Sequence, residues 1–335
     1  MEIPFEHRPA AHCENGVTSN LLRFYGFDLS EPMVLGLGSG LFFSHMPFIK
    51  LNGMAVTSFR PLPGQIFSRV TKGLNITVSR RWFLNRSKAM RALDSLLSKG
   101  IPAGLLVGVY HLPYFPKEYR FHFNAHNLCV VGKEDDIYLI SDPVVMEKTV
   151  ISSADLVRVR YAKGTWPPYG RMYWIKKRPE SIPLKQAICK AIKLNCRWML
   201  HIPFPYFGVK GIHLLARRMK KWEHQFGARK AALNLAQIIR MLEEIGTGGA
   251  GFRFMYAAFL QEAALILEAP QLSDISLRLT QVGDSWREFA AHSARKFKER
   301  GDGVASYEQL SEMLVQIANT EGVIFKDLEG IVKKL

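Results

Sequence analysis

The spacing of apolar residues predicts a helix that begins at Cys13. Between residues 13 and 25, Val17 and Leu21 recur on one helical face, and Gly26 follows as a stop signal. A cysteine at the start of a helix is well placed to act as a thiolate, because the helix N-terminus favours negative charge.

A hairpin is predicted farther along the chain. Residues 127–131 and 136–140 both have strand patterns, and the polar turn 132–135 joins them. His126 precedes the first strand and Asp142 follows the second. Antiparallel pairing therefore brings these two side chains to the same end of the hairpin.

Outside this hairpin, the pattern changes from mixed to helical along the chain. A helix at 84–99 and a buried strand at 102–110 belong to the first part. From about Pro179 the predicted helices cover 183–199, 209–226, 228–245, 253–268, 272–299 and 306–333. We therefore expect an α+β protein with a first domain at 1–178 and a mainly α-helical second domain at 179–335.

The net charge of +16 is concentrated in one segment. Residues 151–230 hold 18 Lys and Arg against 3 Asp and Glu, whereas 1–150 hold 16 against 12 and 231–335 hold 11 against 14. Such a basic segment attracts a negatively charged partner. Three kinds of partner fit this description: a nucleic acid, an anionic membrane or an acidic carrier protein. Charge alone leaves these three partners open.

Composition narrows the class of protein. The 335 residues are 48% hydrophobic, and no run approaches the roughly 18 to 20 uninterrupted apolar residues of a membrane span. The first residues lack the apolar core of a signal peptide, so a cytoplasmic location is expected. Four cysteines without a CxxC pair indicate neither a disulfide framework nor a zinc motif. We expect reduced thiols, no metal and no tightly bound cofactor.

Cys13, His126 and Asp142 are candidates for a nucleophile, its base and the group that orients the base. An imidazole can take the thiol proton, and a carboxylate fixes the imidazole tautomer. Taken singly, each residue has a simpler interpretation, since cysteine is usually a small buried residue and histidine a core or surface residue. The combination favours catalysis, because a helix-borne Cys followed by a strand-borne His and a carboxylate is the chain order of a papain-like site.

Two segments near this constellation are candidates for contact with substrate. The loop 111–120 interleaves prolines with aromatic residues, Tyr114 among them, and is expected to form part of a substrate wall. The run 36–43 resembles a phosphate loop but lacks the following Lys-Ser/Thr. Its glycines, including Gly38, are expected to permit close backbone approach near the active site.

A glycine-rich bend at 246–251 enters an aromatic helix in the second half. It is either a helix-helix corner that needs close approach or one side of a substrate pocket lined by Arg253 and Tyr256. The sequence leaves both interpretations open.

Several phrases resemble the BtrH-like family of butirosin biosynthesis acyltransferases over most of the chain. These phrases are His12-Cys13, Leu29-Ser30-Glu31, the run Gly36 to Leu41, the His126 strand, the Asp142-Pro143 turn, and the segment Gly248 to Glu262. The resemblance implies a papain-like cysteine-protease-type N-terminal domain with a helical domain that covers the substrate cleft. It also implies Cys13 as nucleophile, His126 as base and Asp142 as orienter.

One element of the papain-like pattern is missing. Such enzymes carry a Gln shortly before the nucleophile as an oxyanion donor, and residues 5–11 contain none. His7 or Arg8 are the candidates to replace it, together with the backbone N–H of Cys13.

The type member of the family transfers an aminoacyl group from an acyl carrier protein to an aminoglycoside amine. The resemblance therefore implies an acyltransferase that takes its acyl group from the phosphopantetheine arm of an acidic acyl carrier protein and passes it to a small-molecule acceptor in natural-product biosynthesis. A papain-like peptidase or amidase is the first alternative. A noncatalytic basic protein that binds a membrane or nucleic acid is the second.

The basic residues fall on no nucleic-acid-binding signature, so no nucleic acid is expected. Peripheral contact with the inner face of the membrane stays open, because residues 198–222 mix aromatic and basic side chains.

Overall fold

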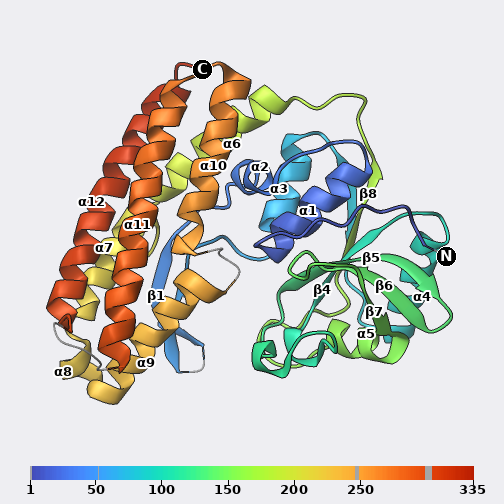
Figure 1. The fold of residues 1–335 in the computed structure, drawn as a ribbon, viewed down its shortest axis with the longest axis horizontal. Helices are drawn as coiled ribbons and strands as arrows, with labels where there is room; N and C mark the ends of the chain where they lie inside the picture. Colours follow the sequence, from blue (N-terminus) through green and yellow to red (C-terminus); the bar gives the residue numbers. More distant parts are fainter. Residues whose placement is uncertain (1, 52, 246–248, 299–303) are drawn as a thin grey trace. The chain divides into compact units, whose positions relative to one another are not determined.

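The computed structural model describes residues 2–51, 53–245, 249–298 and 304–335. The chain forms two compact units, shown by sequence colour in Figure 1. The first unit comprises residues 1–34 and 70–182, and the second comprises 35–69 and 183–335. Residues 35–69 thus group with the helical unit, although they lie inside the range expected for the first domain.

The first unit is built on a six-stranded antiparallel sheet with the order β3-β8-β4-β5-β6-β7. Its strands are β3 (Thr77–Arg81), β4 (Ala103–Val107), β5 (His126–Glu134), β6 (Ile137–Ser141), β7 (Thr149–Ser152) and β8 (Met172–Lys177). β4 is buried along its whole length, as a strand in the middle of a covered sheet must be. The predicted hairpin is confirmed as β5 and β6, with a register shift between Val130 and Gly132.

Helices α1 (Cys13–Phe24), α4 (Arg86–Leu97) and α5 (Ser153–Arg160) pack on this sheet, with α1 and α4 against β5. α2 (Glu31–Leu37) follows α1. The predicted helix after Cys13 is confirmed: Val17 and Leu21 are fully buried, and Gly26 ends the segment with φ +89°. The apolar face of α1 therefore anchors the helix that carries the candidate nucleophile.

The second unit is mainly helical. It contains the hairpin of β1 (Ser44–Leu51) and β2 (Met54–Ser58) and the beginning of α3 (Gln65–Gly73), whose residues from Val70 onward belong to the first unit. Its other helices are α6 (Leu184–Leu200), α7 (Gly208–Met219), α8 (Trp222–Phe226), α9 (Ala228–Ile239), α10 (Arg253–Leu267), α11 (Gln271–Lys298) and α12 (Tyr307–Val332). α10, α11 and α12 pack side by side, as Figure 1 shows. The α+β class with a mainly helical second part is therefore confirmed.

Two predicted helices differ in detail. The helix predicted at 209–226 is interrupted at residues 220–221, which separate α7 from α8. The helix predicted at 228–245 is α-helical only to Ile239 and continues as a π-helix, Arg240–Glu244. Apolar periodicity continues through both breaks, so periodicity alone does not reveal them.

One helical stretch of the described chain, Ala250–Leu267, is long and apolar enough to cross a membrane by length and composition. More than half of it, 56%, is buried inside the protein, and the core helix of a soluble protein passes the same test. A search for uninterrupted apolar runs does not find this stretch, because the charged residues Arg253 and Glu262 lie within it.

Candidate active site

Cys13 is the first residue of α1 and is 6% exposed. His12 caps the helix, since the Asn15 backbone N–H donates to its Nδ1 at 3.3 Å. The incoming chain is held by Glu31, whose carboxylate accepts the backbone N–H of Ala11 at 2.9 Å and of His12 at 2.8 Å. Burial raises the pKa of Glu31, and these hydrogen bonds oppose the rise. A fixed, capped helix start thus holds the Cys13 thiol.

His126 and Asp142 meet at one end of the β5–β6 hairpin. His126 Nε2 lies 2.7 Å from Asp142 Oδ2, and both residues are buried. Tyr114 donates its hydroxyl to the same oxygen at 2.8 Å, and the Val144 backbone N–H donates to Oδ1 at 3.2 Å. Both carboxylate oxygens therefore have donors, which fixes the carboxylate against the imidazole.

The electrostatics of His126 favour its protonated form. Burial lowers its pKa, but the charges of Asp142 and Cys13 and hydrogen bonds to both raise it to about 10. Because Nε2 faces Asp142, Nδ1 is the ring nitrogen left for the Cys13 thiol. The Phe115 ring packs edge-on against the imidazole, with centroids 5.6 Å apart. This arrangement can hold a thiolate beside an imidazolium.

Asn127 is a polar residue at this site that the sequence reasoning did not single out. It is 1% exposed, and its Nδ2 lies 3.9 Å from Cys13 Sγ and 3.4 Å from the carbonyl oxygen of Ala125. The Tyr173 hydroxyl, from β8, donates to Asn127 Oδ1 at 2.9 Å. This bond determines which end of the amide faces the sulfur. The available signal was an amide side chain next to His126 in an otherwise apolar strand.

A glycine allows the Asp142 turn to approach α1. Gly16 lies one turn after Cys13, and a Cβ built on it would overlap the side chains of Pro143 and Ala10. The Ala10 backbone N–H donates to the Pro143 carbonyl at 2.7 Å. The turn that carries Asp142 is therefore held against the segment that carries Cys13.

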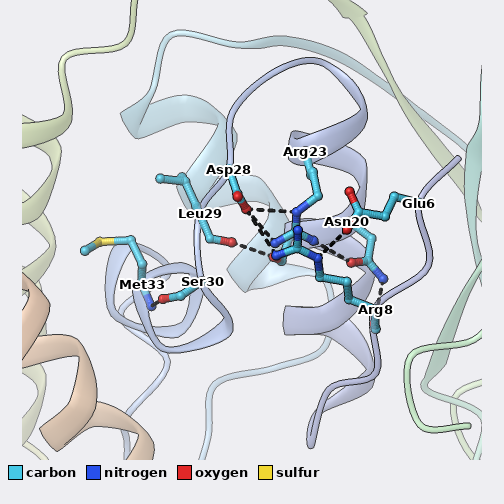
Figure 2. Close-up of polar contacts among 9 residues, drawn as sticks. Glu6, Arg8, Asn20, Arg23, Asp28, Leu29, Ser30 and Met33 are labelled. Carbon is cyan, nitrogen blue, oxygen red and sulfur yellow. Dashed lines mark hydrogen bonds and ion pairs between the residues drawn. The ribbon is translucent and has the colours of Figure 1, made fainter. Parts of the chain in front are cut away.

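The two oxyanion candidates have other contacts. Both ring nitrogens of His7 are engaged, Nδ1 with Ser141 Oγ at 2.8 Å and Nε2 with the Val145 carbonyl at 3.1 Å. Arg8 is half exposed and pairs with Glu6 and Asp28, as Figure 2 shows. Among the described residues, no hydrogen bond joins either side chain to Cys13. Spacing along the chain did not predict this, because the segment before α1 folds its polar side chains onto other partners.

Tyr114 also lies elsewhere than expected. It was a candidate for the substrate wall, but its hydroxyl is committed to Asp142, and burial followed by the Asp142 charge raises its pKa well above the ordinary value. The Tyr114 hydroxyl therefore supports the orienting carboxylate.

The remaining candidates belong to the second unit. Gly38 approaches Ile66 too closely to admit a side chain, and its carbonyl accepts from Arg69. Arg253 is fully buried in a two-point ion pair with Glu321, with N–O distances of 2.8 and 2.9 Å.

Arg253 also donates to the Gly251 carbonyl at 2.8 Å, and Trp286 donates to Glu321 at 2.7 Å. Tyr256 is buried as well. A side chain on Gly251 would overlap Phe59, which fits the interpretation of the glycine-rich bend as a helix-helix corner that needs close approach. Residues 246–248 of this bend lie outside the described chain.

The four cysteines are free thiols, and no group of three or more potential metal ligands occurs among the described residues. Burial raises the pKa of Cys129 above its ordinary value and that of Cys196 to about 12. These two thiols are therefore poor nucleophiles. The apolar face of α7, part of the segment considered for membrane contact, is buried at Ile212, Leu215 and Met219.

Comparison with known proteins identifies two matching family models. The model "Butirosin biosynthesis protein H, N-terminal" matches residues 12–143, and "Domain of unknown function (DUF4872)" matches residues 154–328, more than half of the chain. No curated protein matches the sequence. Among solved structures, a putative C39-like peptidase from Bacillus anthracis is similar with 13% identity and a TM-score of 0.37, covering 53% of this chain and 96% of that one. A TM-score of that size supports no argument about activity.

Proposed function

Since the chain belongs to the DUF4872 family and its residues 12–143 match the N-terminal model of butirosin biosynthesis protein H, we propose that it is a cysteine-dependent acyltransferase. One observation carries the proposal: a buried thiol at a helix start lies beside a histidine whose pKa is raised to about 10 by a carboxylate and by the thiol itself. A thiolate–imidazolium pair of this kind attacks acyl carbonyl groups.

The first half-reaction loads the enzyme. The Cys13 thiolate attacks the carbonyl carbon of a thioester on the phosphopantetheine arm of an acyl carrier protein, and the carbon–sulfur bond to the arm breaks. His126 gives its proton to the departing sulfur, while Asp142 keeps the imidazole oriented. Thioester exchange replaces one thioester with another, so this step has a small free-energy change.

The second half-reaction unloads the enzyme. An amine or hydroxyl of a small molecule attacks the acyl-Cys13 carbonyl, His126 takes the acceptor's proton, and the Cys13 thiolate leaves. We propose that Asn127 takes the oxyanion-donor role considered for His7 and Arg8, because its N–H group already lies next to the reacting Cys13 Sγ.

The basic segment supports the choice of an acidic carrier as donor. Its cations are largely exposed in both units, including Lys176, Lys177 and Arg178 in the first and Arg217, Lys221 and Arg229 in the second. Exposed charges of one sign speed encounter with a partner of opposite charge. We propose a cytoplasmic location, because the reaction needs a reduced thiol.

Product analysis with and without amines tests this function. The protein is incubated with an acyl-loaded carrier protein in the presence or absence of an aminoglycoside, and the products are identified by mass spectrometry. Formation of an acylated amine that depends on Cys13 supports the transferase. Release of free acid alone, at a rate that the amine does not change, would instead identify a hydrolase, and equal activity of Cys13→Ala would exclude covalent catalysis by this residue.

A further inference from the structure

A hollow lined by several cationic side chains lies in the first unit, outside the Cys13 site. It has a volume of about 370 Å³ and is formed by α5, the loop after it, the segment that follows β4, the segment that precedes β5, and the start of α4. Three permanently charged side chains line it, Arg86, Arg158 and Lys163, together with His111 and His122. No carboxylate is among its lining residues.

The three cations have no acidic partner of their own. In the part of the chain that the structure describes, neither an ion pair nor a hydrogen bond engages the charged end of Arg86, Arg158 or Lys163. The nearest carboxylate that acts on the hollow is Asp155, one turn before Arg158 on α5, and Ser152 donates to it at 2.9 Å. Three positive charges against one partly engaged carboxylate give the hollow a positive potential.

His111 responds to this potential. Its pKa is lowered by burial and then by the charges of Arg158 and His122, while Asp155 opposes the change. A lowered pKa favours the neutral imidazole, which still has one N–H group to donate to a ligand.

The walls of the hollow are held in place. Asn124 is buried and donates to the carbonyl oxygens of Lys163 and Thr165 at 3.1 and 3.0 Å, which ties the loop after α5 to the residues before β5. Tyr161 donates to the Phe83 carbonyl at 2.6 Å.

Two aromatic contacts complete the hollow. The guanidinium of Arg86 lies 5.4 Å from the centre of the Tyr161 ring. Tyr110 and His122 stack with centroids 4.1 Å apart, and the Tyr110 side chain is 44% exposed. The hollow thus combines three cationic side chains with an accessible aromatic face.

We propose that this hollow is a binding site for a phosphate ester. The planar guanidinium groups of Arg86 and Arg158 match the oxygens of a phosphate, and the Lys163 ammonium adds a third charge-assisted donor. A volume of about 370 Å³ accommodates the phosphate together with part of the molecule that bears it.

The position of the site suggests whose phosphate it binds. Asn124, which forms one wall, precedes His126 by two residues, a span of at most roughly 7 Å along the backbone. Two natural sources of a phosphate ester near the reaction, the phosphodiester of the donor's pantetheine arm and the monoester of a phosphorylated acceptor, share the phosphate oxygens that the hollow recognises. The choice of these two sources rests on the acyl transfer proposed for Cys13, whereas binding of the phosphate group does not.

Isothermal titration calorimetry tests the site without any need for turnover. Inorganic phosphate, 4′-phosphopantetheine and glucose 6-phosphate are titrated into the full-length protein carrying Cys13→Ala, so that acyl chemistry cannot contribute. We expect saturable binding of at least one of them, weakened roughly tenfold by Arg158→Ala and at least tenfold further by adding Lys163→Ala, because each change removes a charge-assisted hydrogen bond. Arg91→Ala, an exposed α4 arginine outside the hollow, is the matched control and should bind as the parent does.

The three ligands distinguish the sources. Tighter binding of 4′-phosphopantetheine than of phosphate supports a donor site, and tighter binding of glucose 6-phosphate supports an acceptor site. Equal affinity for all three supports a site for the phosphate group alone. The proposal is overturned if none of the three binds saturably, or if the Arg158→Ala, Lys163→Ala double variant binds as tightly as Arg91→Ala.

Discussion

Replacing Asp142 by Asn should lower the pKa of His126 sharply. The substitution keeps the shape of the side chain but removes the negative charge that lies 2.7 Å from His126 Nε2. In the native site the pKa of His126 is about 10 against an ordinary 6.5. This difference corresponds to about 5 kcal/mol in favour of the imidazolium.

Several contributions make up this balance. Burial lowers the pKa of His126, and the Asp142 charge is the largest of the contributions that raise it, ahead of Cys13. Removal of an adjacent opposite charge shifts a pKa by roughly 1 to 3 units. In Asp142→Asn the burial of the ring persists, so we expect the titration midpoint of His126 to fall by that amount or more.

Nitrogen-15 NMR of the labelled histidine ring measures this midpoint directly. Tyr114→Phe is the matched control, because it removes one hydrogen bond to Asp142 but keeps the carboxylate, and it should move the midpoint much less. A midpoint that stays near 10 in Asp142→Asn would refute the conclusion that the carboxylate holds the imidazole protonated.

The raised pKa of His126 also makes the stability of the fold depend on pH. A histidine with a raised pKa stabilises the folded state below its unfolded pKa near 6.5, and this contribution is lost as the pH rises through about 10. The free energy of unfolding of the native protein should therefore fall across that window by more than that of Asp142→Asn. Equal slopes for the two proteins would contradict the assignment.

Three further predictions follow from packing and charge. Gly16→Ala should push the Pro143 turn away from α1, destabilise the fold by about 1 to 3 kcal/mol and slow the alkylation of Cys13. Gly330→Ala, at a position where an added Cβ meets nothing, is the control and should leave stability and alkylation nearly unchanged. Thermal unfolding measures the stability, and the kinetics of iodoacetamide modification measure the alkylation. Arg253→Met should lower the free energy of unfolding, measured in urea, by about 3 to 5 kcal/mol, because Glu321 is left buried without its cationic partner. A decrease below 1 kcal/mol would contradict a stabilising role of the ion pair. The second-order rate with an acyl carrier protein should fall as salt increases, and a rate independent of salt would count against electrostatic docking.

The helix after Cys13 and the β5–β6 hairpin could be predicted because their signals are local. Val17 and Leu21 mark one buried face, and an apolar strand on each side of a polar turn places His126 and Asp142 at one end. The helical second half was predictable for the same reason. Periodicity reports which face of a segment is buried.

Features that depend on distant partners could not be predicted. β8 lies between β3 and β4 in the sheet, although about 70 residues of sequence separate it from β4, and nothing in its local pattern specifies those neighbours. Arg253 was interpreted as a possible pocket residue because its partner, Glu321, lies 68 positions away. The grouping of residues 35–69 with the helical unit has the same cause.

The candidate site shows the same division. Cys13, His126 and Asp142 were identified from residue type and chain order, whereas Asn127 and the inward position of Tyr114 emerged only from packing. His7 and Arg8 were chosen for their distance from Cys13 along the chain, which does not reveal that Ser141 and Asp28 are their partners.

Intact-mass spectrometry of the protein after brief incubation with an acyl-loaded carrier protein tests the central claim most directly. We expect a mass increase equal to one acyl group, mapped to Cys13 by peptide fragmentation and removed by an amine acceptor. Cys13→Ala should show no increase, and Cys196→Ala, which removes a buried thiol of raised pKa, should load as the native protein does. Acyl transfer to an amine without any acylated Cys13, or with full activity in Cys13→Ala, would contradict the account.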